Sequence, residues 1–433
     1  MTGDTRTPRV AIVNLGCRVN RVEVDLIATQ LIDLGCVIVD SAEADVVVIN
    51  TCAVTGEAQA KTRKAVRHAA DLPQSPRVIA CGCAANLFAA ELRGLAPGVV
   101  VEARKDQVSK RVLEAVNLDS IADDRRVPTT HLAISQTPTG RMRPGVKIQD
   151  GCDNRCSYCI VWKARGPSQS LASQDVVAAV TQACERGAHE VVLTGINLGS
   201  YRTSAGDALG EGMGLDALLA HLLEGTPIDR LRLSSIEPPD VTDSLLAVMA
   251  RSDGRIAPFL HVCLQSGCDS TLSRMGRLYT TAQFADMVAK ARTYLPGVAI
   301  ETDVIAGFPG EDEHEFARTL SFCREIEFAR MHVFRFSKRP GTPAAELRCQ
   351  VPAPEIASRA RQLRILGKEM RDSYVRCLDG TIDNVLVIEE GRAVGGHLVE
   401  MGIDPSLRPG TYIQVSLNLN FNLKYMLKAE VHV

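Results

Sequence analysis

The stretch "KIQDGCDNRCSYCI", residues 147–160, places three cysteines, Cys152, Cys156 and Cys159, directly after a short apolar run. A structural zinc site needs four ligands, commonly supplied by two C-x-x-C pairs, and only Cys156 and Cys159 form such a pair in this chain. A four-iron cluster held by three thiolates keeps one iron open for a substrate or cofactor. The spacing therefore favours an open iron–sulfur cluster, and a zinc site completed by a distant residue is the alternative.

Six candidate strands, each followed by a loop and a helix-like segment, recur from this stretch onward. They are "GVKIQ" (145–149), "EVVLTGIN" (190–197), "RLRLSS" (230–235), "LHVCLQ" (260–265), "VAIETDVIAGF" (298–308) and "MHVFRFS" (331–337). Repeated βα units close into a complete or partial parallel barrel, whose chemistry lies at the carboxyl ends of the strands. We therefore expect a barrel over residues 136–375, opened by the Pro- and Gly-rich linker "TPTGRMRPG" (137–145), with the cysteines at its active end.

Residues 1–135 carry short apolar runs without strict alternation, as is typical of parallel strands buried on both faces. The runs end in "NLGC", "INTC" and "ACGC", and the segment "RVEVDLIATQLIDLG" (21–35) between the first two has helical periodicity. Gly35 is suited to end that helix. The pattern predicts a small parallel α/β domain.

Cys17, Cys52 and Cys83 each lie at the end of one of these runs. The carboxyl ends of parallel strands share one edge of a sheet, so the three thiols are expected to converge there. The residues alone leave two interpretations open, a second three-cysteine cluster or three buried structural thiols. Cys81 competes with Cys83, because alternate residues of a strand face the same side.

Residues 376–433 change to β-rich sequence, with clear alternation in "YIQVSLNLNFNL" (412–423). This pattern predicts a small antiparallel barrel or sandwich. From residue 378 onward the basic residues are only Arg392, Arg408, Lys424 and Lys428, against seven Asp and Glu. An electrostatic grip of this region on phosphates would therefore be weak.

The whole chain has 433 residues and a formal net charge of -2, so it has no broad attraction for a polyanion, and any nucleic-acid contact needs local basic patches. It shows neither a charged-then-apolar leader nor an apolar run of bilayer length, so we expect a cytoplasmic protein with no membrane partner. In a reducing compartment its 14 cysteines do not make a disulfide framework, which directs attention to metal binding.

The C-x-x-x-C-x-x-C pattern at the first strand of a βα barrel resembles the radical S-adenosylmethionine enzymes. The resemblance implies a [4Fe–4S] cluster on Cys152, Cys156 and Cys159. In that superfamily the open iron chelates the amino and carboxylate groups of S-adenosylmethionine. Transfer of an electron then cleaves the cofactor to a 5′-deoxyadenosyl radical, for which the protein supplies orientation and a dry site.

The runs "GCRVN", "NTCAVT", "GCAAN", "VVLTGINLGSY", "LRLSSIEP", "LQSG", "DVIAGFPGE" and "FSKRPGTPAAE" follow one another in the order found in the radical methylthiotransferases, which the first 345 or so residues resemble. This resemblance implies a second [4Fe–4S] cluster on Cys17, Cys52 and Cys83, the last favoured over Cys81 by its Gly-Cys-x-Ala context. It also implies a partial (βα)6 barrel and a TRAM-like C-terminal β domain. One S-adenosylmethionine would then donate a methyl group and another would form the radical.

The same resemblance suggests residues that contact S-adenosylmethionine, namely Tyr158, Thr194, Gly195, Ser235, Glu237 and Gly307. Tyr158 lies in the cysteine loop, near which such enzymes hold the adenine; ordinary packing is its alternative role. The turn "TGIN" follows the second strand, "SSIEP" the third and "DVIAGFPGE" the fifth. A solvated carboxylate is the alternative for Glu237, and a structural turn is the alternative for Gly307.

Members of this family methylthiolate N6-threonylcarbamoyladenosine or N6-isopentenyladenosine at position 37 of tRNA, or an aspartate of a ribosomal protein. "GCRVN" and "KIQDGCDNRCSYC" most resemble the threonylcarbamoyladenosine branch. The expected partners are a tRNA anticodon loop, an electron donor such as flavodoxin or ferredoxin, and a sulfur donor. No proton-transfer residue is needed for radical hydrogen abstraction, and none is assigned.

Three features bear on that RNA assignment. A basic helical face in "EAQAKTRKAVRH" (57–68) could touch phosphate, or could simply be solvated. Trp162 and Gln169 stand where the family usually has a proline and an Arg-Ser pair, although Arg165 and Gly166 are kept. The weakly basic C-terminal region is the third, and it could instead recognise a protein.

Overall fold

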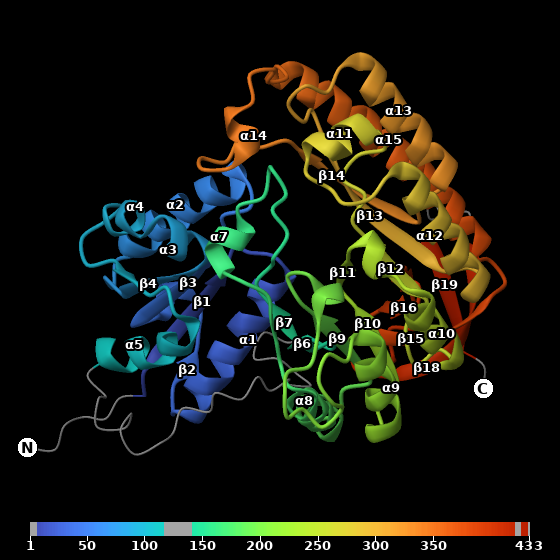
Figure 1. Cartoon of the computed structure of the whole chain (residues 1–433). Helices are drawn as coiled ribbons and strands as arrows, with labels where there is room; N and C mark the ends of the chain where they lie inside the picture. The colour runs from blue at the N-terminus through green and yellow to red at the C-terminus, as the bar shows by residue number, and fades with distance from the viewer. Residues whose placement is uncertain (1–6, 117–140, 421–425, 432–433) are drawn as a thin grey trace, which may run out of the picture.

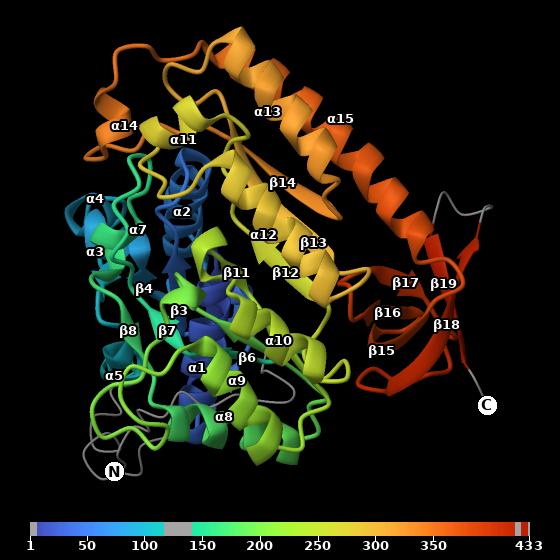
Figure 2. The ribbon, with the colours of Figure 1, turned by 45° about the vertical axis from the view of Figure 1, so that its right-hand side comes forward.

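The computed structural model describes residues 7–116, 141–420 and 426–431 of the chain, which form three regions. An α/β region, blue to cyan, lies beside a central region of parallel strands and outer helices (Figure 1). The long helix α15 (Ala353–Cys377) leads from the central region to a small β-barrel, drawn red (Figure 2). This arrangement confirms the expected fold class. The end of the first region at 135 and the start of the linker lie outside the described residues.

The N-terminal region is a five-stranded parallel sheet in the order β2-β1-β3-β4-β5. Its strands are β1 (Arg9–Asn14), β2 (Val37–Ile38), β3 (Val46–Thr51), β4 (Arg77–Gly82) and β5 (Val100–Val101). Its helices are α1 (Arg18–Asp33), α2 (Gly56–Ala70), α3 (Cys83–Leu87), α4 (Ala89–Arg93) and α5 (Val108–Ala115), with 3-10 turns at Ser41–Glu43 and Lys105–Gln107. Leu31 and Val112 pack on one face of the sheet and Val66 on the other. The three apolar runs form the three central strands, as predicted.

All six predicted strands of the central region are present and parallel. One sheet has the order β10-β9-β6 and the next has the order β11-β12-β13-β14, and β10 runs directly into β11. The strands are β6 (Gly145–Lys147), β9 (Glu190–Thr194), β10 (Arg230–Leu233), β11 (Ser235–Ile236), β12 (Phe259–Val262), β13 (Ala299–Ala306) and β14 (Arg330–Arg335). Among the described residues no pairing joins β6 to β14, so the barrel is partial.

Helices cover the outside of this partial barrel. The main ones are α8 (Ser173–Glu185), α9 (Leu215–Gly225), α10 (Asp243–Arg251), α12 (Thr281–Tyr294), α13 (Glu313–Ile326) and α15. Shorter elements in the loops are α7 (Val161–Arg165), α11 (Asp269–Arg274), α14 (Pro343–Glu346), the strands β7 (Gln149–Asp150) and β8 (Gln169–Ser170), and 3-10 turns at Leu198–Ser200 and Pro238–Asp240. Helix α1 of the N-terminal region lies against the edge strand β6, where a side chain at Gly145 would clash with Val22.

The C-terminal region is a closed barrel in the order β15-β16-β17-β19-β18, so the barrel alternative is confirmed over the sandwich. Its strands are β15 (Ile382–Glu389), β16 (Arg392–Gly395), β17 (Glu400–Gly402), β18 (Tyr412–Asn420) and β19 (Met426–Val431). All pairings are antiparallel except the single parallel contact of β17 with β19 that closes the barrel.

Buried charges fix this barrel to the central region. Glu190 of β9 accepts hydrogen bonds from Arg230 at 2.6 Å and from Arg232 at 2.7 Å, and all three side chains are almost fully buried. The same two guanidinium groups donate to carbonyl oxygens of the C-terminal barrel, as from Arg232 to Gly396 at 2.8 Å. Glu190 therefore neutralises the two arginines that hold the regions together. In the described part of the chain, no helix combines the length and the apolar character needed to cross a membrane.

Replacing Glu190 with glutamine should lower the free energy of unfolding by about 3–5 kcal/mol, because two buried arginines then lack their counter-charge. Chemical denaturation followed by circular dichroism measures this change. Glu389→Gln is the matched control, since Glu389 pairs with Arg392 on the exposed surface, where such a pair contributes at most about 1 kcal/mol. Equal unfolding free energies for the two variants would contradict the role of Glu190.

Candidate active site

The cysteine loop of the barrel begins with a turn that only glycine fits. Gly151 has a φ of +71°, and a Cβ there would lie 1.8 Å from the carbonyl oxygen of Pro167. The backbone N–H of Cys152 donates to Gly166 at 3.1 Å, which ties the loop to the end of α7. Cys156 and Cys159 follow on one tight turn, closed by a 3.1 Å hydrogen bond from the N–H of Cys159 to the carbonyl of Cys156.

The three loop thiols lie within electrostatic reach of one another. Burial raises the pKa of the Cys159 thiol to about 12, and the neighbouring Cys156 and Cys152 add to the increase. The backbone N–H of Val161 donates to the Cys159 sulfur at 3.4 Å and opposes that shift. Soft sulfur donors grouped in this way match the ligands of an iron–sulfur cluster, and no disulfide links any cysteine of the described residues.

Arg277, which the sequence did not reveal as a functional residue, lies beside this loop. Its guanidinium donates to the Cys156 sulfur at 3.2 Å and to the Tyr158 hydroxyl at 3.5 Å, and forms an ion pair with Glu237. Tyr279 orients it through a 3.0 Å hydrogen bond. Arg277 lies between α11 and α12 in "MGRLYT", a loop without metal-ligand or phosphate-loop spacing, so no sequence signal marked it.

A cavity of about 330 Å³ opens next to these residues and is lined by Cys156, Asn197, Glu237 and Arg277 among others. The side-chain oxygen of Asn197 is buried and has no hydrogen-bond partner among the described residues. Burial raises the pKa of Glu237, and Arg277 opposes the increase. An unpartnered acceptor and a carboxylate beside the cysteine loop fit the amino group of S-adenosylmethionine.

The other residues expected to contact the cofactor divide into two groups. Tyr158 is largely buried, with its ring edge toward Phe308 at 6.4 Å between centroids, and Gly195 lies so close to Gln149 that a Cβ would approach its oxygen to 2.8 Å. Ser235 is partly buried in β11. Tyr158 therefore packs within the cysteine loop, and Gly195 packs against Gln149 just before that loop.

Thr194 and Gly307 lie elsewhere. Thr194 lines a different and larger cavity between the regions rather than the one beside Cys156. Gly307 has a φ of +74°, and a Cβ there would clash with Ile356 at 2.4 Å. Its N–H donates to Glu311 at 3.1 Å. For Gly307 this packing favours the structural-turn interpretation.

The N-terminal cysteines end the central strands of the first sheet. Cys52 follows β3 and Cys83 begins α3, both buried, whereas Cys17 precedes α1 and is exposed. Burial raises the pKa of the Cys52 thiol to about 11, and Cys17 and Cys83 raise it further. These three sulfurs therefore lie within electrostatic reach of one another, as the convergence of strand ends led us to expect.

Cys81 faces away from this group. The expectation that residues 81 and 83 share one side fails because β4 ends at Gly82, whose φ of +90° reverses the chain before α3 begins. Cys81 packs in the apolar core with Leu31 and Val112, and Cys83 lies in the core on the other face of the sheet. The geometry therefore favours Cys83 over Cys81 as a ligand.

A buried ionic network joins the two cysteine groups. Glu23 of α1 accepts hydrogen bonds from Arg165 at 2.8 Å and from Lys147 at 3.1 Å, and pairs with Lys105. Burial raises the pKa of Glu23, but these three cations hold it below its usual range. Arg165 also donates to Asn20 at 2.7 Å, and Asn20 accepts a hydrogen bond from Cys17 at 3.4 Å.

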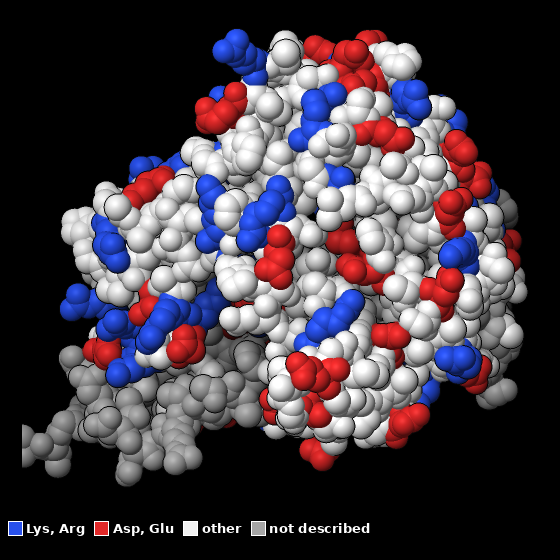
Figure 3. Space-filling model, in the orientation of Figure 1, with Lys and Arg blue, Asp and Glu red and all other residues white. Residues whose placement is uncertain are grey.

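The basic face expected on α2 is largely solvated or paired. Lys61 pairs with Glu57 and Arg63 with Glu91, while Lys64, Arg67 and His68 are exposed without a partner among the described residues. On the C-terminal barrel Arg392 pairs with Glu389 and Glu400. Figure 3 shows both signs of charge interspersed over the face that it presents. A broad positive surface is absent from that face.

The fold and the cysteine loop define the chain as a radical S-adenosylmethionine enzyme, and comparison with known proteins agrees. Residues 146–323 match the model of the radical SAM superfamily, and residues 9–102 match the uncharacterized protein family UPF0004. The fold is similar to a solved structure of the radical S-adenosylmethionine methyltransferase TsrM from Kitasatospora setae, with a TM-score of 0.57 and 16% sequence identity. The match covers 78% of this chain and 77% of the TsrM chain. That likeness concerns the fold alone.

Sequence relatives narrow the class. A threonylcarbamoyladenosine tRNA methylthiotransferase of Thermotoga maritima is 33% identical, over 87% of this chain and 86% of the relative. A threonylcarbamoyladenosine tRNA methylthiotransferase of Bacillus subtilis is 36% identical, over 84% of this chain and 81% of the relative. A tRNA-2-methylthio-N(6)-dimethylallyladenosine synthase of Sphingopyxis alaskensis is 30% identical over 89% and 87%. The chain belongs to the radical S-adenosylmethionine methylthiotransferases and uses [4Fe–4S] clusters and S-adenosylmethionine.

Gly82→Ala should lower the bound iron and acid-labile sulfide by about half, because a Cβ would lie 2.4 Å from Asn50 and displace Cys83 from its neighbours. Iron and sulfide analysis of anaerobically reconstituted protein measures this. Gly35→Ala is the control: its φ of +88° is equally unfavourable for alanine, but nothing lies within 4 Å of its Cβ. An unchanged iron content in Gly82→Ala would contradict the need for this turn.

Proposed function

We propose that the protein inserts a methylthio group at C2 of N6-threonylcarbamoyladenosine 37 in tRNA. The observation that carries the proposal is the pair of three-cysteine groups, one on the barrel and one on the N-terminal sheet, that the Glu23–Arg165 network holds at one junction. The relatives named as threonylcarbamoyladenosine enzymes, at 33–36% identity over most of the chain, support the substrate.

In this proposal the barrel cysteines would hold the cluster that binds S-adenosylmethionine, and Cys17, Cys52 and Cys83 would hold an auxiliary cluster. When bound, these groups supply the one-electron chemistry and the sulfur needed to functionalise an unreactive C–H bond. Asn197 and Glu237 are placed to accept hydrogen bonds from the cofactor's amino group.

The remaining residues of the site act through charge and exclusion of water. Arg277 places a buried positive charge beside the Cys156 sulfur, where it stabilises the negative charge of a thiolate ligand. Tyr158 packs with Phe308, Met275 and Ile305 in a small apolar cluster behind the loop. That cluster keeps solvent from the back of the cysteine loop, which protects a reactive radical.

Several finer points belong to the proposal. We assign the three domains to residues 1–135, 136–375 and 376–433. We also assign the protein a cytoplasmic location. A flavodoxin- or ferredoxin-like protein would supply electrons there, and a separate donor would supply sulfur. N6-isopentenyladenosine 37 is the alternative substrate, since the Sphingopyxis relative carries a dimethylallyladenosine name. A ribosomal-protein aspartate is the other alternative.

Deletion of the gene should remove 2-methylthio-N6-threonylcarbamoyladenosine from total tRNA and leave its unmethylthiolated precursor in place. Nucleoside mass spectrometry measures both, and re-expression of the chain should restore the product. Persistence of the methylthio form in a strain with no other enzyme for it would refute the proposal. Loss of the isopentenyl form instead would select the alternative substrate.

Cys156→Ala should abolish formation of 5′-deoxyadenosine, because the cofactor-binding cluster loses a ligand. Cys52→Ala should retain 5′-deoxyadenosine formation but lose the methylthio product, because only the auxiliary cluster is affected. Chromatography of anaerobic reactions measures both products. Cys377→Ala, which changes an exposed cysteine at the end of α15, is the control. Equal 5′-deoxyadenosine yields from wild type and Cys156→Ala would contradict this division of roles.

A further inference from the structure

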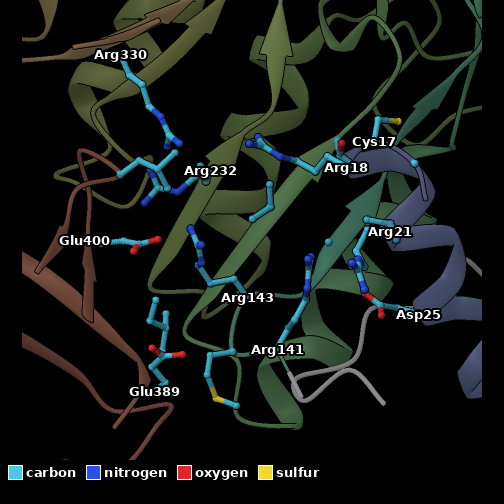
Figure 4. A pocket seen from close by; sticks show the side chains of 18 of the residues that line it. Cys17, Arg18, Arg21, Asp25, Arg141, Arg143, Arg232, Arg330, Glu389 and Glu400 are labelled. Carbon is cyan, nitrogen blue, oxygen red and sulfur yellow. The ribbon is translucent and has the colours of Figure 1, made fainter. Parts of the chain in front are cut away.

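A second cavity, of about 810 Å³, lies where all three regions meet (Figure 4). Helix α1 forms one wall, the barrel strands β9 and β10 form the back, and β15 and β17 of the C-terminal barrel close another side. Seven arginines line it, namely Arg18, Arg21, Arg141, Arg143, Arg232, Arg330 and Arg371. No sequence motif joined these residues, because they come from distant segments of the chain.

The negative charge in this cavity is smaller. Only Asp25, Glu389 and Glu400 contribute carboxylates to its lining, and the last two already pair with Arg392. Among the residues that line the cavity, guanidinium groups therefore outnumber carboxylates, although Glu190 and Glu301 contact some of these arginines from outside the lining. A cavity with this imbalance favours an anionic ligand.

Arg18 is the arginine best placed to receive such a ligand. It follows Cys17 directly, and among the described residues it makes no direct hydrogen bond or ion pair, although Glu301 and Asp303 attract it from a longer distance. Figure 4 shows Arg18 and Arg330 extending into the cavity from opposite walls. Arg330 makes only a long contact of 3.7 Å with Glu301, so it too has donors to spare.

The inner end of the cavity is polar and incompletely satisfied. Thr194 is fully buried, and its hydroxyl has no hydrogen-bond partner among the described residues. Cys17 lies at one edge of the same cavity, and Thr194 directly precedes the turn that borders the cysteine loop. A molecule bound here would therefore reach from the auxiliary cysteine group toward the barrel cysteines.

The interior of the barrel also holds polar pairs outside the lining of this cavity. Inward-facing positions of the strands carry hydrogen-bonding groups, as in the pair of His261 with Asp303 at 2.9 Å and of His332 with Glu301 at 3.4 Å. The alternate positions, such as Leu260 and Ile300, pack against the helices.

We propose that this cavity binds the threonylcarbamoyl group of the substrate base and that Arg18 pairs with its carboxylate. The inference rests on the proposed function and adds a specificity-determining residue to it. The threonylcarbamoyl group offers one carboxylate, one hydroxyl and a urea, which match unpaired guanidinium donors and the free hydroxyl of Thr194. A dimethylallyl group offers none of these and would leave the buried hydroxyl of Thr194 unpaired, which disfavours that substituent.

Binding without turnover tests this assignment. Three anticodon stem–loop RNAs would differ only at N6 of adenosine 37, carrying threonylcarbamoyl, its carboxamide analogue or dimethylallyl. Fluorescence anisotropy with iron–sulfur-loaded protein, without reductant, gives each Kd. Wild type should bind the carboxylate RNA at least about tenfold more tightly than the carboxamide RNA, as expected for a hydrogen bond to a charged group.

The variants separate the charge of Arg18 from its packing. Arg18→Gln should bring the ratio of the two Kd values close to one, and Arg18→Lys should retain part of it. Arg251→Gln, an exposed arginine at the end of α10, is the matched control and should keep the wild-type ratio. The iron content of Arg18→Gln shows whether the change beside Cys17 leaves the clusters in place. If this variant fails to bind its clusters, the wild-type Kd values for the carboxylate and carboxamide RNAs still test the inference.

Each outcome is decisive. Equal affinity of wild type for the carboxylate and carboxamide RNAs would overturn the inference. If Arg18→Gln weakens all three RNAs equally and lowers the salt dependence, Arg18 contacts a phosphate and the assignment is wrong. If the wild-type enzyme methylthiolates threonylcarbamoyl RNA but binds it no more tightly than the carboxamide RNA, the inference fails and the proposed function is retained. Failure to methylthiolate that RNA while the isopentenyl RNA reacts would overturn both.

Discussion

The buried carboxylate of Glu23 is the constraint on which the geometry of this enzyme depends. It lies on α1 with 4% of its side chain exposed, and three cations from other parts of the chain converge on it. Two of them, Lys147 and Arg165, belong to the barrel and flank its cysteine loop. Burying such charges costs desolvation free energy that their attraction only partly recovers, so the network contributes a defined arrangement more than net stability.

That arrangement has two consequences. Arg165 at the end of α7 also contacts Asn20, which accepts a hydrogen bond from Cys17 and donates one to the carbonyl oxygen of Thr51 beside Cys52. The same placement of α1 sets Arg18 on the wall of the large cavity, one residue from Cys17. The ionic network around Glu23 therefore links the placement of the two cysteine groups with the position of Arg18 at the cavity.

Local patterns predicted most of the fold and the ligand candidates. The three N-terminal strands, the six barrel strands and the C-terminal barrel follow from hydrophobic patterning and turn residues, and the cysteines from their spacing at strand ends. Arg277, Asn20 and Glu23 could not be found in this way, because their importance comes from contacts between segments distant in sequence. Cys81 illustrates the same limit: a strand period placed it beside Cys83, and one glycine with positive φ separated them.

The distribution of charge explains how a chain with a net charge of -2 can act on RNA. The sequence led us to look for basic residues on α2 and on the C-terminal barrel, where many are paired or outnumbered. The structure concentrates arginines around one cavity instead, where several guanidinium groups can act on the same bound anion. Such an enzyme gains less from long-range attraction and more from recognising the modified base itself. Discrimination between N6 substituents then depends on what the cavity offers, and its guanidinium groups favour the substituent that carries a charge.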